Sequence, residues 1–265
     1  MDDEYIPALN VMKHIEKYYL PIFLCLSLLG NILSVCVLFC TKLRYNSSSI
    51  FLGALAISDI GVLVTVFVNW FKQIKIINEE YWLLILLDGF FQTVFCFLSV
   101  WIVVAFTVQR YIVIKWPLLR RSLCTVNQAI IIVIGLAGLA VLYSIFFWLV
   151  IWNTTYKNSN IVEEGMIWII CTINAIITSF LPAIMIVIFN SLIVYNVRKQ
   201  NRIRGNMISS FSASNKNTQS SDKEASHIEV TKMLVIISTL FICLNIPIHV
   251  ALLCFSYRVR INIYC

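Results

Sequence analysis

The chain has 265 residues, of which 60% are hydrophobic and only 12% are charged. Soluble domains contain about 25% charged residues, so this composition excludes an ordinary soluble domain and indicates a membrane protein. The formal net charge of +7 is then a guide to topology and no sign of a nucleic-acid partner, because lysine and arginine collect in the cytoplasmic loops of membrane proteins.

Six segments are long and apolar enough to cross a bilayer as helices. A spanning helix needs about 20 mostly apolar residues, and a strand in lipid would leave its backbone groups unpaired. The sequence therefore predicts an all-α membrane protein whose transmembrane bundle covers residues 18–256, between an N-terminus of residues 1–17 and a stub of residues 257–265. The predicted spans are about 18–41, 50–71, 82–114, 126–152, 166–196 and 230–256.

The connecting loops predict the orientation. Connections 42–49, 115–125 and 197–229 are rich in lysine and arginine, which predicts that they are cytoplasmic and that the N-terminus is extracellular. Loop 197–229 is polar and rich in Ser and Asn, so it is either a solvated linker or a docking segment that phosphorylation regulates. Asn153 begins a glycosylation sequon in a predicted outer loop.

Asp59 and Arg110 are charged residues that lie inside predicted spans. Asp59 lies roughly 13 Å deep in the second span, where a carboxylate is costly unless it is paired, hydrated or protonated, and is therefore a functional candidate. Asn31 and Ser99 lie on the first and third spans. They are expected either to meet Asp59 around one hydrated pocket or only to join helices by hydrogen bonds. Arg110 lies near the predicted cytoplasmic end of the third span, where snorkelling into the interface also explains it.

Short motifs occur in a definite order on these spans. They are Gly30-Asn31 in the first, LAISD (Leu55 to Asp59) in the second, Ser99 and QRYIVIKWPL in the third, Pro182 in the fifth and Pro247 in the sixth. In this order they resemble the rhodopsin-like (class A) G-protein-coupled receptors. The stretches SVWIVVAFTVQRY and EVTKMLVIISTLFICLNIPIHV further resemble invertebrate FMRFamide-type neuropeptide receptors. The resemblance implies a rhodopsin-like helical bundle with six of the seven transmembrane helices present, and hence a C-terminally incomplete receptor.

The resemblance also implies a function. The protein would be a multi-pass receptor of the plasma membrane that signals to a heterotrimeric G protein when its sixth helix moves outward. Asn31, Asp59 and Ser99 match the family's sodium pocket, which normally also uses the missing seventh helix; no other cofactor is expected. Two departures stand out, because Gln109 replaces the acidic neighbour of Arg110 and Ile85 replaces a usual disulfide cysteine. The switch residues would be Gln109, Arg110, Tyr111, Pro117, Leu118 and Pro247.

A ligand is expected to enter from outside, between the third, fifth and sixth helices. The absence of an acid at Gln92 disfavours a biogenic amine, and an acidic outer rim that includes Glu79 and Glu163 suits a basic, amidated peptide. The expected ligand is therefore a neuropeptide. The candidate contacts, for each of which helix packing is the alternative, are Asn69, Gln92, Thr93, Cys96, Asn174, Thr178, Asn245 and His249.

Other classes of protein find less support. The sequence shows no paired carboxylates at the membrane, no metal-binding motif and no nucleophile beside a base, so neither an enzyme nor a metal site is predicted. A six-span channel unrelated to receptors would need a pore loop or repeated broken helices, and the sequence shows neither. A receptor fragment that does not signal is the other alternative.

Overall fold

The computed structural model describes residues 5–76, 82–116, 124–157 and 162–211, and every regular element among them is helical. The predicted all-α fold is thereby confirmed for these residues. The predicted sixth span 230–256, the stub 257–265 and the loop beyond residue 211 lie outside the described residues. In chain order the elements are α1 (Tyr5–Cys40), the 3-10 helix η1 (Lys42–Tyr45), α2 (Ser47–Gln73), α3 (Trp82–Lys115), α5 (Val126–Lys157), α6 (Val162–Ala175), the π-helix η2 (Ile176–Phe180) and α7 (Leu181–Phe211).

Five of the described segments are long and apolar enough to cross a membrane, and they correspond to the first five predicted spans. The helices are longer than the spans at two places. α1 begins at Tyr5, inside the predicted N-terminal region 1–17, and α7 continues to Phe211, inside the predicted loop 197–229. Apolar composition marks only the part of a helix that fits in lipid, so it did not predict these polar extensions. The five segments are Tyr18–Cys40, Ser47–Lys72, Leu86–Lys115, Val126–Thr154 and Ile169–Gln200.

Large apolar side chains point outward along these helices. Phe23, Ile131 and Phe146 are each more than 60% exposed, a costly arrangement in water but the normal one in lipid. The buried share of residues differs between the spans. In the most apolar part of Leu86–Lys115 it is 44%, whereas in the most apolar part of Tyr18–Cys40 it is only 6%. Of the five spans, the third is therefore the one that is most enclosed by other parts of the protein.

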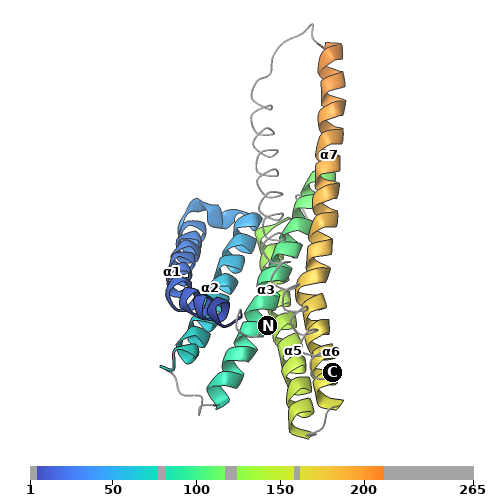
Figure 1. Cartoon of the computed structure of the whole chain (residues 1–265). Coiled ribbons are helices and arrows are strands. Elements are labelled where there is room, and N and C mark those ends of the chain that lie inside the picture. Colours follow the sequence, from blue (N-terminus) through green and yellow to red (C-terminus); the bar gives the residue numbers. More distant parts are fainter. Residues whose placement is uncertain (1–4, 77–81, 117–123, 158–161, 212–265) are drawn as a thin grey trace. The chain divides into compact units, whose positions relative to one another are not determined.

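The chain divides into two compact units, each of which is described by itself. The first contains Met1–Ile102 and Val126–Trp152, and the second contains Val103–Thr125 and Asn153–Cys265. In the first unit α1 and α2 pack side by side and η1 joins them (Figure 1). In the second unit the end of α3 contacts α7, through aromatic and hydrogen-bonded side chains described below.

Three glycines let aromatic rings lie directly on the helix backbone in the first unit. A Cβ atom at Gly53 would collide with Phe39 of α1, one at Gly61 with Phe95 of α3, and one at Gly89 with Trp148 of α5. Small residues are common at helix contacts in membranes because they allow such close approach. The glycines therefore fix how α1, α2, α3 and α5 meet.

The fifth span is interrupted by one wider turn. The π-helix Ile176–Phe180 lies between α6 and α7 and ends two residues before the buried Pro182. Proline has no backbone N–H and its ring clashes with the preceding turn of an α-helix, and π-turns often occur at functional sites. The turn contains Thr178, whose Oγ1 donates to the backbone oxygen of Asn174 at 2.7 Å.

Candidate functional site: two carboxylates between the second and third spans

Asp59 on α2 is half-buried and contacts α3 within the first unit. The hydroxyl of Ser99 donates to Oδ1 of Asp59 at 2.6 Å, and Ser99 is only 6% exposed. A short bond of this kind, from a hydroxyl to a carboxylate, is among the stronger hydrogen bonds in proteins. The structure thus brings together two of the three residues that the sequence placed around one pocket.

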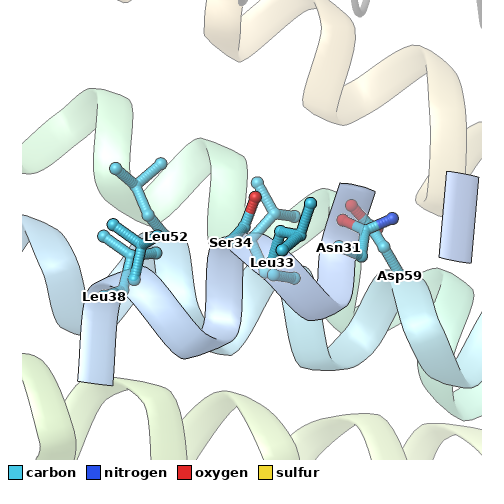
Figure 2. A pocket seen from close by; sticks show the side chains of 9 residues that line it. Asn31, Leu33, Ser34, Leu38, Leu52 and Asp59 are labelled. Carbon is cyan, nitrogen blue, oxygen red and sulfur yellow. The ribbon is translucent and has the colours of Figure 1, made fainter. Parts of the chain in front are cut away.

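The third residue, Asn31, lies in the same groove as Asp59. This groove has a volume of about 470 Å³ and runs between α1 and α2. Figure 2 shows Asn31 and Asp59 at one end of it and Leu38 and Leu52 at the other. The Asn31 amide donates to the backbone oxygen of Ser27 at 3.1 Å, within its own helix. Asn31 therefore shares the cavity with Asp59, while its N–H is engaged elsewhere.

The groove makes a small cation chemically suitable at this place. Asp59 supplies a carboxyl group, and carboxylate, amide and hydroxyl oxygens are the ligands that hard cations prefer. Leu33, Ser34 and Val37 on the α1 side are exposed, so the cavity reaches the surface of the unit. Among the described residues no group of three or more His, Cys, Asp and Glu side chains gathers.

A second carboxylate, which the sequence reading did not single out, joins the same two helices. Nζ of Lys72, in the last turn of α2, lies 2.8 Å from Oδ2 of Asp88 on α3. The two side chains are 14% and 6% exposed, and Lys72 also lies 3.4 Å from Oδ1 of Asn69. The signal that could have found this pair is the one used for Asp59, because Asp88 is an acid inside a predicted span and needs a partner.

The residues expected to contact a ligand differ in their hydrogen bonds and in their exposure. The Thr93 hydroxyl accepts a hydrogen bond from Nε1 of Trp148 at 3.2 Å and donates to the backbone oxygen of Gly89 at 2.9 Å. It therefore joins α3 to α5, which is the packing alternative. Asn69 is exposed, and Gln92 and Cys96 are half-buried.

The other expected ligand contacts are distributed elsewhere. Asn174 and Thr178 are half-buried and belong to the second unit, whereas the residues of the preceding paragraph belong to the first. Asn245 and His249 lie outside the described residues, as does Pro247. The predicted glycosylation site, Asn153, is exposed near the end of α5.

The predicted switch residues lie at the end of α3 in the second unit. The Arg110 guanidinium carbon lies 5.0 Å from the ring centroid of Phe106, and Gln109 is only 7% exposed. The Tyr111 ring packs on Phe189 of α7 at 5.5 Å between centroids. Pro117 and Leu118 lie outside the described residues. Arg110 thus has an aromatic neighbour on its own helix, and the next residue ties α3 to α7.

The comparison with protein families now identifies the chain. The family described as 7 transmembrane receptor (rhodopsin family) matches residues 30–264. The chain belongs to this family. It is a multi-pass membrane protein, and membership overturns the alternative of a six-span channel unrelated to receptors.

A curated relative of this rhodopsin-family receptor is galanin receptor 2b of Danio rerio. The two are 24% identical over 261 residues, which cover 94% of this chain and 64% of the relative. The chain thus spans 64% of the length of that relative. In this rhodopsin-family chain, α3 carries each polar contact between helices described above for the first unit: Ser99 with Asp59, Asp88 with Lys72, and Thr93 with Trp148.

Proposed function

We propose that this protein is a receptor for an extracellular peptide and that it passes the signal to a heterotrimeric G protein. The observation that carries the proposal is the family match over residues 30–264. The relative is by its name a receptor for galanin, which favours a peptide ligand. The resemblance of the third and sixth spans to FMRFamide-type receptors narrows the proposal to an amidated neuropeptide, bound at the plasma membrane from the side of an extracellular N-terminus.

The proposed switch is the end of α3. Packing of Tyr111 on Phe189, and a 2.9 Å hydrogen bond from Nε2 of Gln200 to the backbone oxygen of Ile114, tie this end to α7. These contacts favour a mechanism in which α3 and α7 stay together while the sixth helix, pivoting at Pro247, moves outward and uncovers Arg110. Such activation is a two-state equilibrium, which a ligand biases by binding one state more tightly.

Gln109 bears on the basal level of signalling. An amide cannot form an ion pair with Arg110, so the silent state would be held less firmly than with an acid at this position. We expect Gln109→Asp to lower basal G-protein activation at equal surface expression. Gln109→Glu tests the same point with a longer acid. Unchanged basal activity in both variants would contradict this role for Gln109.

Asp59, Ser99 and Asn31 are proposed to hold a sodium ion that favours the silent state. The 2.6 Å contact of Ser99 with Asp59 and the adjoining groove support this proposal. For the ligand we retain Asn69, Gln92, Cys96, Asn174, Thr178, Asn245 and His249 as proposed contacts. Thr93 suits this role less well, because its hydroxyl already accepts a hydrogen bond from Trp148 and donates one to Gly89.

One experiment tests the proposed function against the alternative of a non-signalling fragment. The full chain, with an epitope tag at its N-terminus, is expressed in cells and labelled without permeabilisation. Dissociation of G-protein subunits is then followed while galanin and a library of amidated neuropeptides are applied. We expect surface labelling and a response to at least one peptide, and loss of that response in Arg110→Met at equal surface level. Surface-labelled protein that answers no peptide would favour the fragment.

A further inference from the structure

The end of the second unit that carries Arg110 also presents a group of exposed positive charges. Arg198, Lys199 and Arg202 on α7 and Lys115 on α3 are all exposed. Neither residues 103–116 nor residues 181–211 contain an acidic residue. Among the described residues, no acid lies within ion-pair distance of these four side chains. Their charge is therefore directed toward whatever surrounds the protein.

The two helices hold these charges at one level. Gln200, which lies between Lys199 and Arg202, donates from Nε2 to the backbone oxygen of Ile114, the residue before Lys115. The Lys115 ammonium lies 4.5 Å from the ring centroid of Trp116 and 5.2 Å from that of Tyr111. Cation–π contacts of this kind orient a lysine without neutralising it. The basic group is thus a fixed feature of the α3–α7 contact.

This level coincides with the ends of two apolar spans. The spans Leu86–Lys115 and Ile169–Gln200 both end among the basic residues. Tyr195 is 63% exposed and Trp116 is 43% exposed, and exposed aromatic side chains of this type favour the boundary between lipid and water. Ile203 is also 49% exposed, although it follows Arg202 directly. Charges, aromatic rings and an apolar side chain at one level match the headgroup region of a bilayer.

We propose that this basic group, defined as Lys115, Arg198, Lys199 and Arg202, binds the phosphate of an anionic phospholipid. Arg198 and Arg202 are four residues apart and lie on one face of α7, so two guanidinium groups can share one headgroup. Guanidinium binds phosphate oxygens in a bidentate manner. Lysine and arginine clusters just beyond a spanning helix are the usual signature of phosphatidylserine and phosphoinositide binding. The site goes beyond the proposed receptor function, because lipid binding requires neither ligand nor G protein.

The test uses the purified full chain without a G protein. The protein is reconstituted in nanodiscs of phosphatidylcholine that contain phosphatidylserine or phosphatidylinositol bisphosphate, and the lipid that stays bound after extraction is measured by native mass spectrometry. The triple variant Arg198→Gln, Lys199→Gln and Arg202→Gln removes three charges from exposed positions. The matched control, Lys42→Gln with Arg44→Gln, removes exposed basic residues of η1. Size-exclusion chromatography verifies that both variants are folded.

We expect the triple variant to retain about a hundredfold less phosphoinositide than the unchanged chain, and the control to retain it almost fully. Arg198→Lys with Arg202→Lys keeps the charge but not the bidentate geometry, and an intermediate retention is expected. Equal loss in the triple variant and the control would mean a general charge effect and would overturn the proposed site. Unchanged retention in the triple variant, together with weakened G-protein coupling in cells, would assign the basic group to the G protein instead.

Discussion

The two carboxylates between α2 and α3, Asp59 and Asp88, differ in what balances their charge. Asp88 has a full countercharge, because Lys72 lies 2.8 Å away and both side chains are nearly buried. Asp59 has a hydroxyl donor, Ser99, at 2.6 Å, and a groove of about 470 Å³ beside it. A charge buried in a membrane must be paired or hydrated. The first carboxylate is paired by the protein itself, whereas the second has room for water or an ion.

The packing around Asp88 is closed, whereas the packing around Asp59 is open. Next to Asp88, the Trp148 ring lies directly on Gly89 and donates to Thr93. Next to Asp59, the α1 side of the groove reaches the surface. The comparison teaches that a buried acid in this chain is structural where its surroundings are closed and is a candidate binding group where they are open. Variants at the two carboxylates and in their surroundings test that distinction.

The largest effect is expected from Lys72→Met, which leaves Asp88 buried without its countercharge. Removing one partner of a buried ion pair typically costs about 3–5 kcal/mol. We expect a loss of this size in the free energy of unfolding, measured by denaturant titration of the purified protein in nanodiscs. The double variant Lys72→Met with Asp88→Leu removes both charges and is expected to recover most of the loss. A double variant as unstable as the single one would show that the ion pair is not the cause.

Gly89→Ala tests the closed packing beside Asp88. An added methyl group would collide with the Trp148 ring, and forcing extra volume into a packed site costs about 1–3 kcal/mol. The matched control is Gly138→Ala on α5, where a Cβ would meet nothing within 4 Å. We expect the control to be neutral or stabilising, because alanine favours a helix over glycine. If Gly89→Ala is as well tolerated as Gly138→Ala, the packing of α3 around Asp88 is not closed as described.

Much of the fold could be predicted because lipid imposes a simple rule on composition. The first five spans followed from apolar length alone, and the described helices correspond to them. The polar ends of α1 and α7 did not follow, since nothing in hydropathy marks where a helix ends in water. Nor did the π-turn Ile176–Phe180, because it depends on how one turn accommodates Pro182. Length in lipid is readable from a sequence, whereas local helix geometry is not.

The candidate sites divide in a similar way. The meeting of Asp59 with Ser99 was one of two alternatives that the sequence left open, and family motifs mark both residues. The pairing of Lys72 with Asp88 was missed because it depends on how two helices are rotated about their axes, which apolar composition does not specify. Thr93 looked like a ligand contact for its polarity and position, but Trp148, 55 residues away in the chain, occupies its hydroxyl. Residue type marked the candidate positions, but the contacts of each residue depend on how the helices pack.

The same chemical change at the two carboxylates should have opposite consequences. Asp88→Asn leaves Lys72 without its anion and is expected to cost about 3 kcal/mol. Asp59→Asn removes a carboxyl group that has no countercharge among the described residues, so stability should stay within about 1 kcal/mol of the unchanged chain or increase. Replacing choline by sodium at constant ionic strength should raise the unfolding midpoint of the unchanged chain but not of Asp59→Asn. A sodium effect that persists in Asp59→Asn would place the ion elsewhere.

The smallest effect is expected from Ser99→Ala, and it bears most directly on whether the Asp59 site is open. In a sealed site, loss of a hydrogen bond to a charged acceptor costs about 1.5–3 kcal/mol. Because the groove beside Asp59 has a volume of about 470 Å³, it has room for water molecules that can replace the lost hydroxyl, and we expect a loss of only about 0.5 kcal/mol. Ser34→Ala is the matched control, since Ser34 lines the same groove but donates to its own helix at Gly30. A loss above about 2 kcal/mol in Ser99→Ala alone would mean that Asp59 is as enclosed as Asp88, and the reason for assigning an ion to one carboxylate and not to the other would disappear.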